Sequence, residues 1–144
     1  MIEQDTVKLL RECDAGVKMG ISSIDEVISY VREEKLRKYL SDCKREHERL
    51  SEEIDVMLAK CCDKGKEPSI IAKGMSSAKT IVKLVMSESD NSVADLMTDG
   101  CNMGVKSLSR YLNQYKGASE ESKDIAKKLI AIEEKLAVEI RDFL

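Results

Sequence analysis

Apolar residues recur every three or four positions along most of the chain, which is the spacing that places side chains on one face of an α-helix. The pattern predicts a first helix over about 5–31 and a second over about 36–61, with a short break at 32–34. The first helix carries one polar residue, Asp14, on its apolar face, and the second carries the lone histidine, His47. Two such faces joined by a short break predict a pair of packed helices.

The rest of the chain follows the same plan after a loop. Gly and Pro mark this loop at 63–69, and a shorter helix is predicted over about 70–86. At 1.5 Å per residue that helix is roughly 25 Å long, enough to carry the chain from one end of a bundle to the other. Two more long helices are predicted, one over about 93–115 and a last one capped by Ser119 or Ser122.

A six-residue motif occurs twice in nearly the same form. Residues 13–18 and 101–106 share the pattern C-x-x-G-V-K, with Asp or Asn second, at an offset of 88. Because the copies lie in the first and third of the four long helices, the motif predicts two related helix pairs. Two long helices, a crossover and two more long helices is the connectivity of bundles with one long connection. We therefore predict one domain, 1–144, folded as an all-α four-helix bundle with an internal two-fold repeat and a helical crossover between the second and third principal helices.

Composition agrees with this fold and narrows the class of protein. The chain has one Pro, one Phe and no Trp, and 35% of its residues are charged, which favours helices over a sheet. The net charge is −3 with both signs interleaved, so no basic stripe indicates a nucleic-acid partner. No apolar run approaches the roughly 20 residues that span a bilayer, and the first residues lack the features of a signal peptide. We therefore expect a cytoplasmic protein with no membrane span.

The residues that carry chemistry are sparse. The five cysteines are an odd number, and three of them fall on apolar helix faces, as small buried thiols do. The adjacent Cys61 and Cys62 are a conceivable redox or metal handle, but the simpler interpretation is a pair of thiols at a helix end. A single histidine excludes a His-based triad and a two-His zinc site within one chain.

Several short motifs, each weak alone, occur in a definite order. They are Leu10-x-x-Cys13-x-x-Gly16, Leu40 to Leu50 with His47, Gly65 to Pro68, the helix around Gly74, Cys101-x-x-Gly104, Tyr111-Leu112 and Ile140-Arg141-x-x-Leu144. In these residues the chain, over about 7–144, resembles a family of ferritin-like bacterial proteins of unknown function. The resemblance implies a ferritin-like bundle. Other ferritin-like proteins with this layout hold a di-iron or di-manganese site.

Metal-binding ferritin-like proteins take a Glu from the first helix of each pair and a Glu-x-x-His from the second. By approximate alignment, the six corresponding positions hold Val17, Lys44, His47, Val105, Glu134 and Ala137. Only two of these residues are of a ligand type, and they come from different pairs. The valines remove both central carboxylates, and a lysine repels a cation. A shift of one turn would bring in Asp14, Asp99, Glu46 or Glu133.

We therefore expect a non-catalytic protein with no catalytic residue, no cofactor and no metal. The resemblance implies that it acts through its surface, by binding a protein partner or as a homo-oligomer. The candidate surface is an apolar stripe on the predicted crossover helix, formed by Ile70, Ile81 and Leu84.

The alternative is a degenerate metal-binding or redox protein that uses iron, manganese or zinc. Its candidate ligands are His47, Glu134, Asp14 and Cys43. For His47, the competing interpretation is a core histidine hydrogen-bonded to a neighbour. If the first two helices turn near Arg32, Ile21 lies level with His47, and Asp14 lies roughly 10 Å further along at 1.5 Å per residue. For Asp14, the competing interpretation is a residue that fixes helix register or lies at the wet edge of the face.

Overall fold

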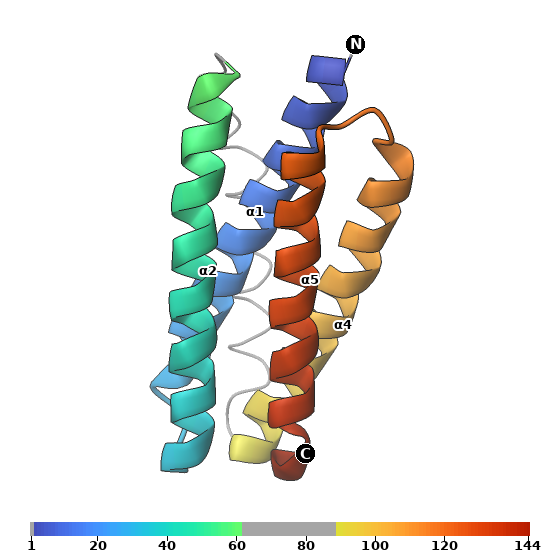
Figure 1. Ribbon diagram of the computed structural model, residues 1–144. Coiled ribbons are helices and arrows are strands. Elements are labelled where there is room, and N and C mark those ends of the chain that lie inside the picture. The colour runs from blue at the N-terminus through green and yellow to red at the C-terminus, as the bar shows by residue number, and fades with distance from the viewer. Residues whose placement is uncertain (1, 62–88) are drawn as a thin grey trace.

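The computed structural model describes residues 2–61 and 89–144, and this part of the chain is an all-helical four-helix bundle, as predicted. The elements are α1 (Ile2–Ile28), α2 (Glu34–Lys60), α4 (Asp90–Gln114), α5 (Glu120–Glu139) and a short 3-10 helix, η1 (Arg141–Phe143). Helices α1 and α5 run in one direction and α2 and α4 in the other (Figure 1). Each of α1 and α5 contacts the other three long helices.

Some predictions concern residues outside the described ranges. They are the loop at 63–69, the crossover helix at 70–86, Cys62, and the apolar stripe of Ile70, Ile81 and Leu84. Within the described ranges, no helix is long and apolar enough to cross a membrane.

Helix bounds agree with the prediction to within a turn. The first helix ends at Ile28 rather than near residue 31, because the N–H groups of Tyr30 and Val31 bond to carbonyls three residues back instead of four. Ser119 is the N-cap of α5, and its hydroxyl accepts the N–H of Ser122. Both serines offered as the cap therefore take part in one capping arrangement.

The buried face of α2 shows why this stretch is helical. It contains seven buried residues at spacings of three and four: Leu36, Leu40, Cys43, His47, Leu50, Ile54 and Leu58. By sequence spacing alone the first six of these residues continue to Met57 and Cys61, but these two side chains are only half-buried. Each buried aliphatic side chain contributes about 2 kcal/mol to folding through the hydrophobic effect, so the face holds the helix against its neighbours.

The core is divided into two apolar clusters, one above the other in the orientation of Figure 1. The lower cluster comprises Ile24, Val27, Val31, Leu36, Leu40, Cys43, Val93, Met97, Cys101, Leu136 and Ile140. The upper cluster comprises Leu9, Leu10, Cys13, Val17, Leu50, Ile54, Leu58, Leu108, Ala118, Ile125, Ala126 and Leu129. Half-buried Ile132 packs against both. A thin layer between the two clusters is therefore the centre of the bundle.

Each turn between paired helices is held by the start of a helix from the other pair. The Asp90 carboxylate, at the start of α4, accepts the backbone N–H groups of Arg32 and Glu33 at 2.8 Å each, at the turn into α2. At the opposite end, the Asp5 carboxylate of α1 accepts the N–H of Gly117 at 2.9 Å. The Thr6 hydroxyl accepts the N–H of Ser119 at 2.8 Å. Both turns thus have their exposed donors satisfied by the other helix pair.

Burial in the two helix pairs follows a different register from the C-x-x-G-V-K motif. The buried residues Leu9, Leu10, Cys13, Val17 and Ile24 of α1 correspond to Val93, Ala94, Met97, Cys101 and Leu108 of α4 at an offset of 84, not 88. At 84, the sequence also aligns Gly16, Met19, Gly20 and Ser23 with Gly100, Met103, Gly104 and Ser107. Buried positions therefore match at an offset one helical turn shorter than that of the motif. The motif did not reveal this, because residues four apart lie on the same helix face.

We expect the Asp90 contact to be important for stability. Replacement of Asp90 by Ala removes the acceptor of two N–H groups at the start of α2, so the free energy of unfolding should fall by about 1–2 kcal/mol. The measurement is urea denaturation followed by circular dichroism. Asp95→Ala, which removes an exposed carboxylate from the same helix, is the control and should change stability by less than about 0.5 kcal/mol. Equal effects of the two substitutions would contradict this role of Asp90.

Candidate functional site

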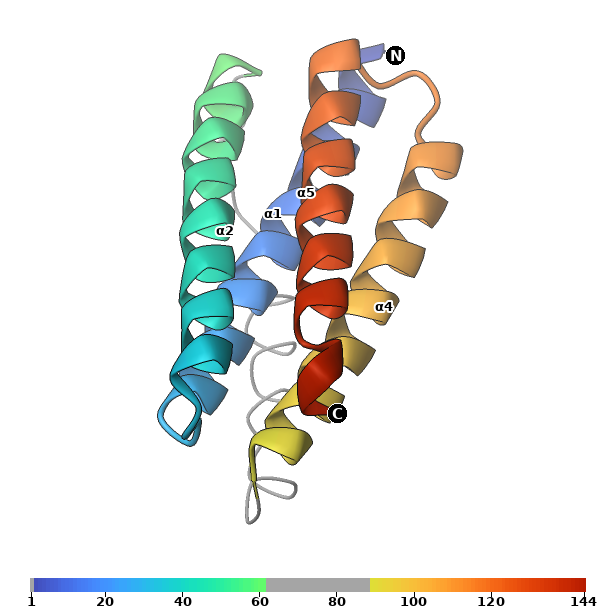
Figure 2. The same cartoon turned by 60° about the horizontal axis from the view of Figure 1, so that its bottom comes forward.

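The layer between the two clusters is the candidate site, because a polar side chain from each helix pair, His47 and Glu133, lies against a glycine of its partner helix there. We call it the central layer and define it by Gly20 of α1, His47 of α2, Gly104 of α4 and Glu133 of α5. On every helix the layer falls between a residue of the lower cluster and one of the upper cluster. Figure 2 shows the four helices that surround it.

His47 lies against Gly20. A Cβ atom on Gly20 would be 2.7 Å from both Cδ2 and Nε2 of the imidazole, so only glycine leaves room for the ring. The Nδ1–H of His47 donates to the Cys43 carbonyl, with the two atoms 2.9 Å apart, and the Cys43 thiol is 3.5 Å from Nδ1. A carbonyl can only accept, so this bond places the proton of the neutral ring on Nδ1. Burial lowers the pKa of His47, against a smaller opposing effect of the Cys43 carbonyl.

Glu133 occupies the matching position in the other pair. Its carboxyl lies against Gly104, and a Cβ on that glycine would be 2.8 Å from Oε2 and nearer still to Oε1. Desolvation by burial raises the pKa of Glu133 to about 8. Among the described residues, no hydrogen bond or ion pair holds this carboxyl. At neutral pH Glu133 is therefore mostly the uncharged acid.

Two thiols border the layer from the lower cluster. Burial is the main cause that raises the pKa of Cys101 to about 12 and the pKa of Cys43 further still. Glu133 contributes to both shifts, and Cys101 contributes to that of Cys43, which places the three groups near one another. The central layer thus holds an imidazole and a carboxylic acid and is bordered by two thiols, and each of these groups is in its neutral form at pH 7.

The structure brings together only part of the predicted ligand set. His47 and Cys43 are in contact, and His47 is a buried core histidine with a hydrogen bond. Glu134 is on the exposed face of α5, so the carboxylate that turns inward is that of its neighbour Glu133. The Asp14 carboxylate pairs with Lys18 on its own helix, at 2.9 Å.

Other positions from the ferritin-like alignment also lie away from the centre. Lys44 reaches the surface, where its ammonium pairs with the Asp25 carboxylate of α1 at 2.6 Å. Val17 is buried in the upper cluster. In residues 4–61 and 89–144, no group of three or more His, Cys, Asp or Glu side chains is arranged to hold a metal ion.

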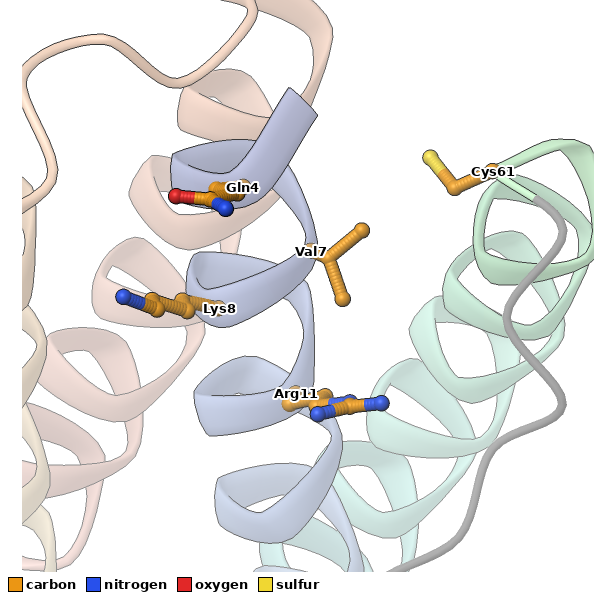
Figure 3. Close-up of a pocket in the computed structure, with 5 residues that line it drawn as sticks. All are labelled: Gln4, Val7, Lys8, Arg11 and Cys61. Atoms are coloured by element: carbon orange, nitrogen blue, oxygen red, sulfur yellow. The ribbon is translucent and has the colours of Figure 1, made fainter. Parts of the chain in front are cut away.

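An open pocket of 330 Å³ lies between the start of α1 and the end of α2, lined by Gln4, Val7, Lys8, Arg11 and Cys61 (Figure 3). Val7 points towards the Cys61 side, whereas Gln4 and Lys8 lie on the other side of α1. Among the described residues, this lining contains neither a carboxylate nor an imidazole. The pocket is therefore a weaker candidate for chemistry than the central layer.

The ferritin-like alignment places Glu133 at a ligand position only if it is shifted by one turn. A second correspondence would have identified it. Buried Leu36, Leu40, Cys43, Leu50 and Ile54 of α2 match Ser122, Ala126, Leu129, Leu136 and Ile140 at an offset of 86, and this offset pairs His47 with Glu133. The spacing of buried residues therefore indicates that Glu133 turns inward. This becomes visible only when α2 is aligned with α5 separately from the alignment of α1 with α4.

Comparison of the chain with protein-family models, with curated proteins and with solved structures gives no match. Its function is therefore inferred from its own residues.

The contact between Gly20 and His47 predicts opposite effects for two glycine substitutions. In Gly20→Ala the new methyl group collides with a ring held by a hydrogen bond, so the free energy of unfolding should fall by about 1–3 kcal/mol. In Gly100→Ala no described atom lies within 4 Å of the new methyl, and the higher helix propensity of Ala should add about 0.5–1 kcal/mol. Chemical denaturation measures both. Stabilisation of both variants would contradict the contact.

The buried acid predicts a pH-dependent effect of Glu133→Gln. A carboxyl whose pKa is raised by folding, from 4.5 to about 8, makes the protein progressively less stable as pH rises between those values. Glutamine stays neutral, so the variant should match the parent near pH 4 and be the more stable protein at pH 8 and above. The difference should reach at most about 4 kcal/mol, the value for a carboxylate that stays buried. Denaturation curves at several pH values test this. Exposed Glu134→Gln is the control and should follow the parent throughout.

Proposed function

We propose that the protein is a ferritin-like four-helix bundle with an internal two-fold repeat, which acts without catalysis through association of its surface. The observation that carries the proposal is the packing of the central layer. In each helix pair a glycine accommodates a polar side chain from the partner helix, His47 on Gly20 and Glu133 on Gly104. These inward-turned groups take part in packing between helices, so the centre of the bundle serves its architecture.

The direction of the helices supports the ferritin-like part of the proposal. Helix α2 ends and α4 begins at opposite ends of the bundle, which requires a long connection between them (Figure 1). Bundles of the ferritin type have one such connection between two antiparallel pairs. The repeated burial pattern and the two caps exchanged between the pairs support the internal two-fold repeat.

Two methionines indicate which surface associates. Met19 of α1 and Met103 of α4 are large apolar side chains with exposed fractions of 37% and 68%. They are equivalent in the 84-residue register, and each precedes a glycine of the central layer. A homodimer usually brings the same patch of two copies together, and exposed apolar side chains are suited to burial in such a contact. We therefore propose self-association through the middle of α1 and α4.

Sedimentation velocity over a range of protein concentrations tests this proposal. The parent chain should form a dimer, and replacement of both Met19 and Met103 by Lys should shift it to the monomer, because a desolvated charge opposes association. The control replaces the exposed valines Val56 and Val138 by Lys and should leave the dimer intact. A parent chain that stays monomeric at all concentrations, or equal effects of the two double variants, would overturn the proposal.

A further inference from the structure

We propose that the carboxyl of Glu133 is a proton-controlled plug in the central layer. As the acid, it lies on Gly104 and closes the space between α4 and α5. As the carboxylate, it turns out to solvent and opens a path for small reagents to the thiols of Cys101 and Cys43.

The space over Gly104, which we call the seat, holds the carboxyl of Glu133 in the closed form. Gly104 has no side chain, and the carboxyl of Glu133 fills the place that a Cβ atom would take. Both residues keep partial solvent exposure, whereas Cys101 and Cys43 are 4% and 3% exposed. Glu133 is thus a partly exposed group that interacts with two enclosed thiols. It ends in a flexible side chain that can rotate outward without moving the helix backbone.

The surroundings of the carboxyl are suited to the acid and not to the carboxylate. The titratable groups that interact with it are the thiol of Cys101 on α4 and the thiol of Cys43 on α2. No titratable group of α1 is among the described groups that interact with it. Lys135, two residues further along α5, is exposed and pairs with Glu46 of α2 at 3.6 Å.

An ionised Glu133 would therefore have no described cation in its seat, and burial of an unpaired charge is costly. The simplest relief is rotation of the side chain into water, where the carboxylate regains its hydration. Burial raises the pKa of Glu133 to about 8 in the closed form, whereas an outward carboxyl would titrate near 4.5. The equilibrium for opening should then rise by about tenfold per pH unit between these values and level off above about 8.

Thiol labelling by methyl methanethiosulfonate between pH 5.5 and 9.5 tests the plug. The labelling rate of each cysteine, read by peptide mass spectrometry, is divided by its rate in the unfolded chain at the same pH, which removes the intrinsic effect of thiolate formation. Protection of Cys101 and Cys43 should fall by about tenfold per pH unit up to pH 8. In Glu133→Gln it should be independent of pH. Glu134→Gln should behave as the parent does.

Two further measurements keep the test specific. Cys13 is buried in the upper cluster, so its protection should stay constant while that of Cys101 and Cys43 falls. Gly104→Ala places a methyl group in the seat and displaces the carboxyl, so both thiols should lose protection already at pH 6. The proposal is overturned if Cys13 loses protection in parallel, which would indicate global unfolding. It is also overturned if parent and Glu133→Gln show the same pH dependence.

Discussion

The close approach of a glycine to a polar side chain, repeated once in each helix pair, determines the centre of this bundle. A Cβ atom on Gly20 or Gly104 would occupy the space that the His47 ring or the Glu133 carboxyl now fills. Because the glycines permit this contact, the two polar groups lie between apolar clusters instead of at the surface. Their burial, in turn, is the main cause of both pKa shifts. The packing of the layer and its electrostatics thus have the same origin.

The two halves of the central layer differ in the pH range that they disfavour. Burial lowers the pKa of His47, so stability that depends on the neutral ring is lost as pH falls through 6.5 and below. Burial raises the pKa of Glu133 to about 8, so stability that depends on the neutral acid is lost as pH rises from 4.5 to 8. The imidazole and the carboxylic acid therefore have opposite effects on how stability changes with pH. Neither group carries a full charge into the core near neutral pH.

The sequence was sufficient for the elements and the core but not for the register. Spacings of three and four residues predicted the four described helices, the buried face of α2 and the inward position of His47, because each depends only on residues within one helix. The repeat offset and the inward carboxylate depend on how helices align with one another. Glu133 and Glu134 are adjacent acids on one helix, and the packing of α5 against Gly104 turns the first inward. The apolar spacing indicates this position only when the second helix of each pair is aligned separately from the first.

What fixes the register is polar contact at three levels of the bundle, rather than apolar spacing. A helix shifted by one turn keeps the same apolar face, so the two clusters alone would tolerate the shift. The carboxylate of Asp90 reaches the N–H groups of Arg32 and Glu33 in only one alignment of the pairs. Asp5 and Thr6 impose the same alignment at the opposite end. The glycine contacts exclude a shift in one direction, because it would bring Ile24 in place of Gly20 to His47, where its side chain would occupy the space of the ring. A shift in the other direction would bring Gly16, so the contacts at the two ends of the bundle have to exclude it.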